Sequence, residues 1–227
     1  MPVVPWKGPP PFGGKAMVFG AMKRSAPPVE NGKAKLKEKK NSRQNDAITV
    51  VLEAALFAAQ KHSTQRRKDK ETSPYINHPL ALAHKLATMG EVSDPEILCA
   101  ALLHDTVEDT DTTFEELEGR FGSRIASIVR EVTDDKTIEK IERKRLQEVK
   151  AAGKSPEAKL VKLADKISNL GDILTSPPSD WSRETKLEYF EWADRVVKGL
   201  RGSNQALEDE FDRLLALGIH EFGTAKA

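Results

Sequence analysis

The sequence predicts an all-α fold, a globular bundle of several helices. From residue 46 onward, apolar residues recur every three or four positions, which is the spacing of one helix face. No stretch in that region alternates between apolar and polar residues as a half-buried strand does, and no repeat of fixed period indicates a solenoid. Capping residues and prolines stand where helices are expected to start, and glycines where they are expected to end.

The first two predicted helices flank a polar loop. The first is expected to begin near Asp46, with an apolar stripe from Ile48 to Ala59, and to stop before His62. A cationic side chain at that end gains from the helix dipole without any catalytic role. Pro79 suits the first position of the next helix, because its missing N–H has no helical partner there, and this places His78 at the helix start.

A third helix is expected to be capped by Ser93 or Asp94, to start at Pro95 and to run through Asp109. Gly122, Gly202 and Gly218 are expected to stop later helices. The further helices are expected over 113–122, 123–132, 138–151, 155–172, 182–200 and 203–217.

The composition is that of a soluble globular protein, with 31% charged and 38% hydrophobic residues among 227. No apolar run approaches the ~20 residues that span a bilayer, so we expect no membrane partner. The single cysteine, Cys99, excludes an internal disulfide and a thiolate zinc site, and it favours a reducing compartment. We therefore expect a cytoplasmic location.

The first 45 residues differ in composition from the rest. They carry ten Lys and Arg against two Glu, whereas residues 46–227 carry 26 Lys and Arg against 33 Asp and Glu. They also hold seven of the thirteen prolines, with no sustained helical or strand period. We therefore expect a disordered basic arm over residues 1–45 and one domain over residues 46–227. The arm is open to three interpretations, a solvated extension, an organellar targeting peptide or a weak nucleic-acid tether, and a charge run alone does not make nucleic acid an expected partner.

One segment concentrates the side chains that bind metals. His104, Asp105, Glu108 and Asp109 supply an imidazole and three carboxylates. On one helix, His104 would lie over Glu108, and Asp105 over Asp109. Three carboxylates so close repel one another in a part-buried cleft, and a divalent cation is the simplest way to keep all of them ionised. The alternative is a solvated helix end, since acidic residues are common on surfaces.

Two other segments favour the metal site. His78 stands at a helix start, where its side chain can be aimed into a cleft. Asp165 borders the apolar stripe of helix 155–172, where an unpaired carboxylate is unfavourable and a cation would resolve the conflict. The expected ligands, His78, His104, Asp105 and Asp165, include no thiolate and suit manganese, iron or magnesium, with zinc as an alternative.

A six-coordinate ion with four protein ligands has open positions for water and for substrate oxygens, which suits hydrolysis. Glu108 and Asp109 are then candidate general bases or water orienters. Local positive charge at Arg66, Arg67, Lys68 and in helix 138–151 suits an anionic substrate with phosphate groups. Helix 138–151 also alternates Glu with Lys and Arg, as solvated helices do.

Three ordered motifs resemble the HD-domain hydrolases of the RelA/SpoT type. These motifs are Arg67–Lys68 with Tyr75–Pro79, then Ala100–Thr110, then Lys159–Leu170. Within that family, Glu131–Thr137 and Tyr189–Leu200 are similar to the stand-alone small alarmone hydrolases, the metazoan SpoT homologues. The resemblance covers residues 46–217.

The resemblance implies a fold and an activity. The fold is the HD-domain helical bundle, and the activity is a manganese-dependent guanosine 3′-diphosphate 5′-diphosphate (ppGpp) 3′-pyrophosphohydrolase that uses a metal-activated water and leaves GDP and pyrophosphate. The positions that match the family's Mn²⁺ ligands are His78, His104, Asp105 and Asp165, and those that match its catalytic acidic pair are Glu108 and Asp109. The positions that match its nucleotide site are Arg67, Lys68, Lys140, Asn169 and Tyr189.

The sequence departs from the family at one position. Small members of the family often carry a basic residue four positions before the tyrosine, and here Thr185 stands there, with Arg183 and Lys186 nearby. The grip on the phosphates is therefore expected to differ at this point.

Two other functions remain open. A site built around phosphate and one metal need not read the base strictly, so a metal-dependent phosphatase acting on another nucleotide, such as NADPH, is one alternative. The other is a non-catalytic helical binding module with a structural cation and an arm that engages nucleic acid. The sequence does not predict an oligomeric state.

Overall fold

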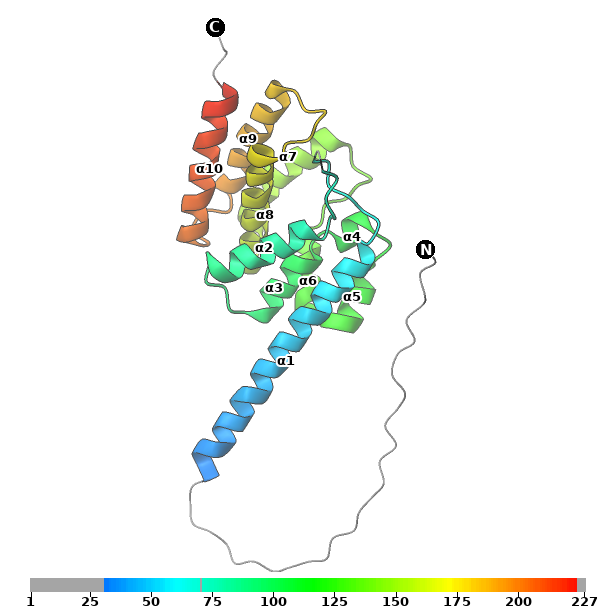
Figure 1. The fold of residues 1–227 in the computed structure, drawn as a ribbon, viewed down its shortest axis with the longest axis vertical. Helices are drawn as coiled ribbons and strands as arrows, with labels where there is room; N and C mark the ends of the chain where they lie inside the picture. Colours follow the sequence, from blue (N-terminus) through cyan, green and yellow to red (C-terminus); the bar gives the residue numbers. More distant parts are fainter. Residues whose placement is uncertain (1–30, 70, 224–227) are drawn as a thin grey trace, which may run out of the picture. The chain divides into compact units, whose positions relative to one another are not determined.

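A computed structural model describes the backbone of residues 31–69 and 71–223, with side chains from residue 46 onward. Within these ranges the regular structure is helical, and the β-type pairing is one isolated bridge between Arg66 and Pro74 (Figure 1). The expected all-α fold is confirmed. The elements are α1 (Asn31–Lys61), α2 (Asn77–Thr88), α3 (Pro95–Leu103), α4 (Thr106–Asp109), α5 (Phe114–Phe121), α6 (Ser123–Val132), α7 (Lys140–Lys150), the 3₁₀ turn η1 (Ala151–Gly153), α8 (Pro156–Thr175), α9 (Arg183–Lys198) and α10 (Gln205–Gly223).

The chain divides into two units, Met1–Lys40 and Asn41–Ala227, and the second contains the core and the site. Helix α1 begins at Asn31, so the start expected near Asp46 is wrong, and residues 31–45 of the expected arm are helical here. The rest of that arm, residues 1–30, lies outside the described residues. The domain boundary expected at residue 46 stays a prediction.

The described part of α1 has apolar residues on more than one side. Phe57 and Ala58 are buried in the core, whereas Ile48, Leu52 and Leu56 are 53%, 63% and 60% exposed. The predicted stripe from residue 48 to residue 59 is therefore only in part the buried face. Apolar spacing alone does not distinguish two apolar faces of one helix, and the packing partners make that choice.

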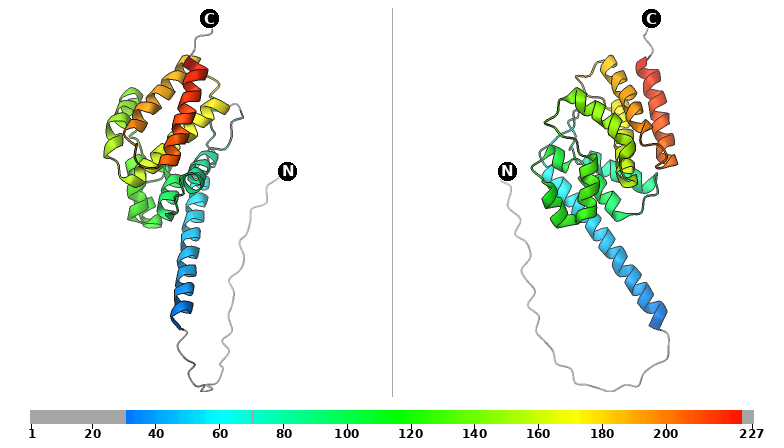
Figure 2. Two further views of the ribbon diagram at one scale, coloured as in Figure 1. Left: turned by 90° about the vertical axis from the view of Figure 1, so that its left-hand side faces the viewer. Right: turned by 180° about the vertical axis from the view of Figure 1, so that it is seen from behind.

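Helix α8 lies at the centre of the domain. It packs against α2, α3, α6, α9 and α10, and Figures 1 and 2 show it among these helices from several sides. Its apolar residues Leu163, Ile167 and Leu170 are completely buried. Since neighbours surround α8 on most sides, its polar residues Asp165 and Lys166 are buried as well. Charged side chains are seldom buried without a partner, and such groups cluster at functional sites, so the centre of α8 is a candidate site.

Side chains cap the helix starts that the sequence predicts. Asp94, Thr113, Ser155 and Ser182 each accept a hydrogen bond from a backbone N–H two or three residues later. Such a cap contributes about 0.5–2 kcal/mol, which helps to define where each helix begins. Gly122 separates α5 from α6 with a φ of 89°, a conformation that glycine adopts readily.

Gly218 has another role than the predicted one. Helix α10 continues past it to Gly223, so the expected stop at Gly218 is wrong. A Cβ atom at this position would lie 1.9 Å from the Phe190 ring of α9. The absence of a side chain at Gly218 therefore allows α10 to pack closely on α9. The glycine at this position serves packing and does not end the helix.

The helix predicted from residue 95 through residue 109 is interrupted. Helix α3 ends at Leu103 and α4 begins at Thr106, with His104 and Asp105 between them. Asp105 has φ −101° and ψ −2°, a sparsely populated conformation that recurs at active sites. The Thr106 hydroxyl donates a hydrogen bond to the Leu103 carbonyl at 2.7 Å and stabilises the turn. The prediction that one continuous helix stacks His104 over the following carboxylates is therefore wrong.

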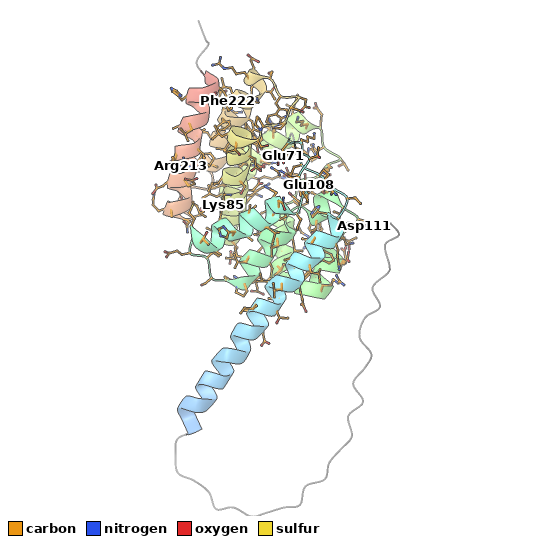
Figure 3. All side chains as sticks on the ribbon, viewed as in Figure 1. Glu71, Lys85, Glu108, Asp111, Arg213 and Phe222 are labelled. Atoms are coloured by element: carbon orange, nitrogen blue, oxygen red, sulfur yellow. The ribbon has the colours of Figure 1, made fainter. Side chains whose placement is uncertain are left out.

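The C-terminal end of α1 forms ion pairs with the loop after α4 and with α5. The Lys61 ammonium lies 2.9 Å from Asp111, which Figure 3 labels, and 3.2 Å from Glu116. These contacts place the loop that follows α1 beside α4. None of the helices in the described ranges has the length and apolar character needed to cross a bilayer.

Candidate active site

Side chains from three separated segments meet beside α8. His78 comes from the first turn of α2, His104 follows α3, and Asp165 lies in the middle of α8. Their ligand-type atoms all lie within 4.8 Å of one another, and His78 Nε2 is 3.3 Å from Asp165 Oδ1. The packing of α2 and α3 on α8 thus brings together three of the four expected metal ligands.

Asp105, the fourth expected ligand, lies at the edge of this group. Its Oδ2 atom is 2.8 Å from His104 Nε2, and it accepts a hydrogen bond from the Tyr75 hydroxyl. The turn between α3 and α4 is the reason that Asp105 and His104 point to the same place although they are consecutive in the chain.

One ring nitrogen of each histidine faces a carboxylate of this group, His78 Nε2 towards Asp165 and His104 Nε2 towards Asp105. The His104 Nδ1 nitrogen lies 2.8 Å from the Ala101 carbonyl, which can only accept, so Nδ1 carries a proton. The lone pair of Nε2 is then the one that a metal can bind, once Nε2 has lost its own proton. Imidazoles and carboxylates together therefore fit a divalent metal ion.

The carboxylates of this group stay ionised although they are buried. Burial raises the pKa of Asp165, but the Lys166 ammonium and the His78 ring together hold it well below its usual range. Lys166 Nζ donates to Oδ2 at 3.1 Å, and Asn169 Nδ2 donates to Oδ1 at 2.7 Å. Burial likewise raises the pKa of Asp105, but the charge of His104 lowers it below the ordinary value.

The pKa of His104 shifts in the opposite direction from the pKa values of Asp105 and Asp165. Burial lowers its pKa, but the charge and hydrogen bond of Asp105 outweigh burial and raise the pKa to about 9. Without a cation the imidazole is therefore protonated near neutral pH. Binding of a divalent ion by His104 would have to displace this proton.

The two acidic residues of α4 have different surroundings. The Glu108 carboxylate, marked in Figure 3, accepts the backbone N–H of Asp134 at 3.1 Å, and its burial raises its pKa. The Asp109 carboxylate accepts from Gln65 Nε2 at 2.9 Å and from the ammonium of Lys136. Glu108 thus has a spare oxygen, whereas both oxygens of Asp109 are engaged.

A cleft of about 640 Å³ opens beside this group. The loop between α1 and α2, together with α2, α8 and α9, forms its walls. Four of the five residues expected to bind the nucleotide line it, namely Arg67, Lys68, Asn169 and Tyr189, together with His78 and Asp109. The fifth, Lys140, is the exposed first residue of α7 and is not among the residues that line this cleft.

The basic and the aromatic side chains that line the cleft are both held by contacts with neighbouring side chains. Arg67 pairs with Asp172 and lies 5.8 Å from the centre of the Tyr75 ring. Trp181 and Tyr189 pack with ring centres 5.5 Å apart. Burial, followed by the charge of Asp165, raises the pKa of Tyr189, so its hydroxyl stays protonated.

Thr185 has no basic substitute in the cleft. The Arg183 guanidinium donates to the Phe222 carbonyl at 3.0 Å, and the Lys186 ammonium lies 5.7 Å from the centre of the Phe222 ring. Both cations are therefore directed to the end of α10. The positive charge of the cleft comes from the loop between α1 and α2.

Several residues of the site were not singled out from the sequence as functional. Tyr75 holds Asp105, Gln65 holds Asp109, and Trp181 lines the cleft. Lys166 is 3% exposed and lies between Asp165 and the Trp192 ring, 4.5 Å from the ring centre. Tyr75 and Lys166 stand inside the quoted motifs, but Gln65 and Trp181 carry no local signal of a role, because each contact joins distant segments.

The fold and the buried His and Asp group define a protein of the HD type, and comparison with known proteins agrees. A family model described as HD domain matches residues 54–196. This chain belongs to the HD-domain family. It is also 58% identical over 165 residues to guanosine-3′,5′-bis(diphosphate) 3′-pyrophosphohydrolase MESH1 of Xenopus tropicalis, covering 73% of this chain and 92% of that protein. The human protein of the same name is 56% identical over 164 residues, covering 72% of this chain and 92% of its own length.

A solved structure extends the comparison to three dimensions. It is described as a metazoan ortholog of SpoT that hydrolyzes ppGpp, and it matches with a TM-score of 0.73 at 47% identity, over 74% of this chain and 94% of that one. A Listeria monocytogenes protein matches with a TM-score of 0.53 at 29% identity, over 64% of this chain and 97% of its own. The expected resemblance to the metazoan SpoT homologues is confirmed.

Proposed function

We propose that this chain is a manganese-dependent ppGpp 3′-pyrophosphohydrolase, which converts ppGpp to GDP and pyrophosphate. The observation that carries the proposal is the convergence of His78, His104 and Asp165 beside a cleft that Arg66, Arg67 and Lys68 line with positive charge. The activity in the names of the curated relatives, at 56–58% identity over most of their length, supports the same reaction.

The residues that would hold the ion are His78, His104, Asp105 and Asp165. Their nitrogen and oxygen donors, with no thiolate, suit manganese. When bound, the ion supplies Lewis acidity and makes a coordinated water more acidic.

The cleft residues bind the rest of the substrate. Arg67 and Lys68 bind phosphate oxygens, since a guanidinium matches two of them at once. Trp181 and Tyr189 give the cleft an aromatic wall for the nucleoside. Asn169 remains bound to Asp165 and keeps that carboxylate in place.

The acidic pair divides two tasks. Glu108 takes the proton of the attacking water, because its raised pKa brings it closer to the working pH than an ordinary carboxylate. Asp109, whose two oxygens are already engaged by Gln65 and Lys136, orients the water and the phosphate group.

The test combines substrate, metal and one variant. The purified protein is incubated with ppGpp and Mn²⁺, with and without a chelator, and the nucleotide products are resolved by chromatography. We expect GDP and pyrophosphate in the presence of metal only. Glu108→Gln should retain Mn²⁺ binding and lower kcat by about 10²–10⁴, the usual contribution of a general base.

The control is Glu118→Gln, the same change at an exposed position of α5, which should leave kcat as in the unmodified protein. An unchanged kcat in Glu108→Gln would remove Glu108 from the mechanism. Phosphate release from NADPH with no reaction of ppGpp would instead favour the other nucleotide phosphatase. The cytoplasmic location stays a prediction from the cysteine content.

A further inference from the structure

His62 is buried at the point where α1 ends. Its place in the sequence predicts a helix-end cation without a catalytic role, but the residue is only 2% exposed. Its ring packs on the Tyr75 ring, with centres 4.8 Å apart and planes inclined at 37°. The side chain therefore lies behind the cleft and not in solvent.

Hydrogen bonds connect His62 to an acidic residue of the site through one amide. Gln65 Nε2 lies 2.9 Å from Asp109 Oδ2, and Gln65 Oε1 lies 2.6 Å from His62 Nδ1. A carboxylate only accepts, so the amide NH₂ must face Asp109. The amide oxygen then faces His62 and only accepts, so Nδ1 of His62 carries the proton.

The other ring nitrogen agrees with this direction. His62 Nε2 is buried and has no hydrogen-bond partner, which fits a neutral ring protonated at Nδ1 alone. Donation therefore runs in one direction, from His62 to Gln65 and from Gln65 to Asp109. If His62 did not donate, the amide would lose the contact that sets its orientation, and its oxygen could turn toward the Asp109 carboxylate.

Asp109 is held from a second side by a weaker constraint. The ammonium of Lys136 reaches its other oxygen from the loop between α6 and α7, and the Lys136 side chain is 49% exposed. An exposed lysine is a flexible partner, and its pairing is screened by salt. The amide of Gln65 is part-buried and therefore gives the more rigid of the two contacts.

We propose that Gln65, with its amide oriented by His62, is a positioning residue that aims the Asp109 carboxylate into the cleft. This inference rests on the proposed function, in which Asp109 orients the attacking water. It gives a task to two residues outside the metal ligands and the nucleotide-binding set. Gln65 lines the cleft and His62 does not, and in this proposal both act through Asp109.

The experiment replaces Gln65 and His62 by side chains of similar size that cannot donate a hydrogen bond. Gln65→Met deletes the amide at nearly the same length, and His62→Phe keeps a ring on Tyr75 but deletes the Nδ1 proton. We expect kcat for ppGpp to fall at least tenfold in Gln65→Met and at least threefold in His62→Phe. KM should stay within twofold in both, because the cations of the cleft are unchanged. Gln60→Met, the same change at an exposed position of α1, is the matched control and should not alter kcat.

A double-mutant cycle separates positioning from general support of the fold. If Gln65 acts through Asp109, Gln65→Met should lower kcat less than twofold further in the Asp109→Asn background. An equal loss in both backgrounds, or an unchanged kcat in Gln65→Met alone, would overturn the inference.

A measurement without turnover keeps the test independent of the substrate. Nitrogen-15 NMR of the imidazoles should show His62 protonated at Nδ1 and bare at Nε2, and Asp109→Asn should shift the Gln65 side-chain NH₂ signals. The opposite tautomer, or unmoved NH₂ signals, would refute the donor chain. If the unmodified protein does not convert ppGpp, the proposed function fails, and the NMR result still decides whether Gln65 holds Asp109.

Discussion

Two groups of acidic side chains join α8 to its neighbours, and they differ in what surrounds the carboxylates. On the surface, Arg124 of α6 lies 2.9 Å from Asp94 and 3.2 Å from Glu157, and it also pairs with Glu96. These side chains are 30–44% exposed. Beside the cleft, the side chain of Asp165 is 12% exposed and faces His78 and Lys166.

The difference separates a structural role from a functional one. Around Arg124 one guanidinium satisfies several carboxylates, water reaches all of them, and such pairs contribute about 0–1 kcal/mol. Beside the cleft, two buried imidazoles face carboxylates that are ionised away from water. That arrangement is unfavourable in the empty protein and becomes favourable when a cation binds.

The largest effect should come from Asp165→Asn. The change removes the buried charge on which the predicted metal site depends, and we expect Mn²⁺ affinity to fall by more than roughly a hundredfold, because even outer-shell changes lower metal affinity 10–100-fold. Hydrolysis of ppGpp should become undetectable. Calorimetric titration with Mn²⁺ measures the affinity, and far-UV circular dichroism checks that helicity is retained. Unchanged affinity in a folded variant would show that Asp165 is not a ligand.

The second prediction concerns the proton that His104 holds in the absence of metal. Burial lowers the pKa of His104 but Asp105 raises it to about 9, so below that pH the cation must displace a proton. Mn²⁺ affinity should therefore fall as the pH falls from 8 to 6, by up to about tenfold per unit. Calorimetry in two buffers with different ionisation enthalpies should detect release of about one proton per ion.

An affinity that is independent of pH in that range, with no released proton, would contradict this coupling. The carboxylates around Arg124 differ from this site, because they pair with a guanidinium and not with an expected metal ligand.

The smallest effect should come from Arg124→Met. Burial raises the pKa of Asp94, but Arg124 and backbone N–H groups lower it below the ordinary value. A lowered folded-state pKa means that the pairing stabilises the fold above the unfolded pKa, about 4, and that this stability is lost as the pH falls through the folded pKa. The free energy of unfolding should therefore drop by less than about 1 kcal/mol at pH 7.

The difference between Arg124→Met and the unmodified protein should shrink below about pH 4, where Asp94 becomes protonated. Thermal denaturation at pH 7 and pH 3 measures it. Arg145→Met is the control, because among the described residues Arg145 pairs with Glu142 alone, on its own exposed helix, and no change in Tm is expected. A difference in Tm that is larger at pH 3 than at pH 7 would show that the contribution of Arg124 does not depend on the ionised Asp94.

Short-range signals predicted most of the helices. Thr113 accepts the capping hydrogen bond expected of it, because a cap depends on residues only two or three positions away. Of the two expected caps before Pro95, Ser93 and Asp94, it is Asp94 that accepts such a bond. The break at His104 and Asp105 had no such signal, since apolar and helix-forming residues stand on both sides. The contact of Tyr75 with Asp105 spans 30 positions and exists only in the folded chain.

The candidate site shows the same division. The residue types at positions 78, 104, 105 and 165 predicted a metal site, and the structure brings their side chains together, while their roles stay predictions. Lys140 matched the family by sequence but does not line the cleft. Gln65 and His62 carried no signal at all, because an amide and a helix-end imidazole are common on surfaces.

By itself the sequence determined the helical class, the helix starts and the kinds of ligand available, because these depend on side-chain chemistry and on interactions within a few residues. Only the tertiary structure decided which ring nitrogens are left without partners, which carboxylates are buried and which amide faces Asp109. Those properties depend on the distances between helices packed around α8, and a shift of one helix by a few ångströms would change them without altering a single local signal.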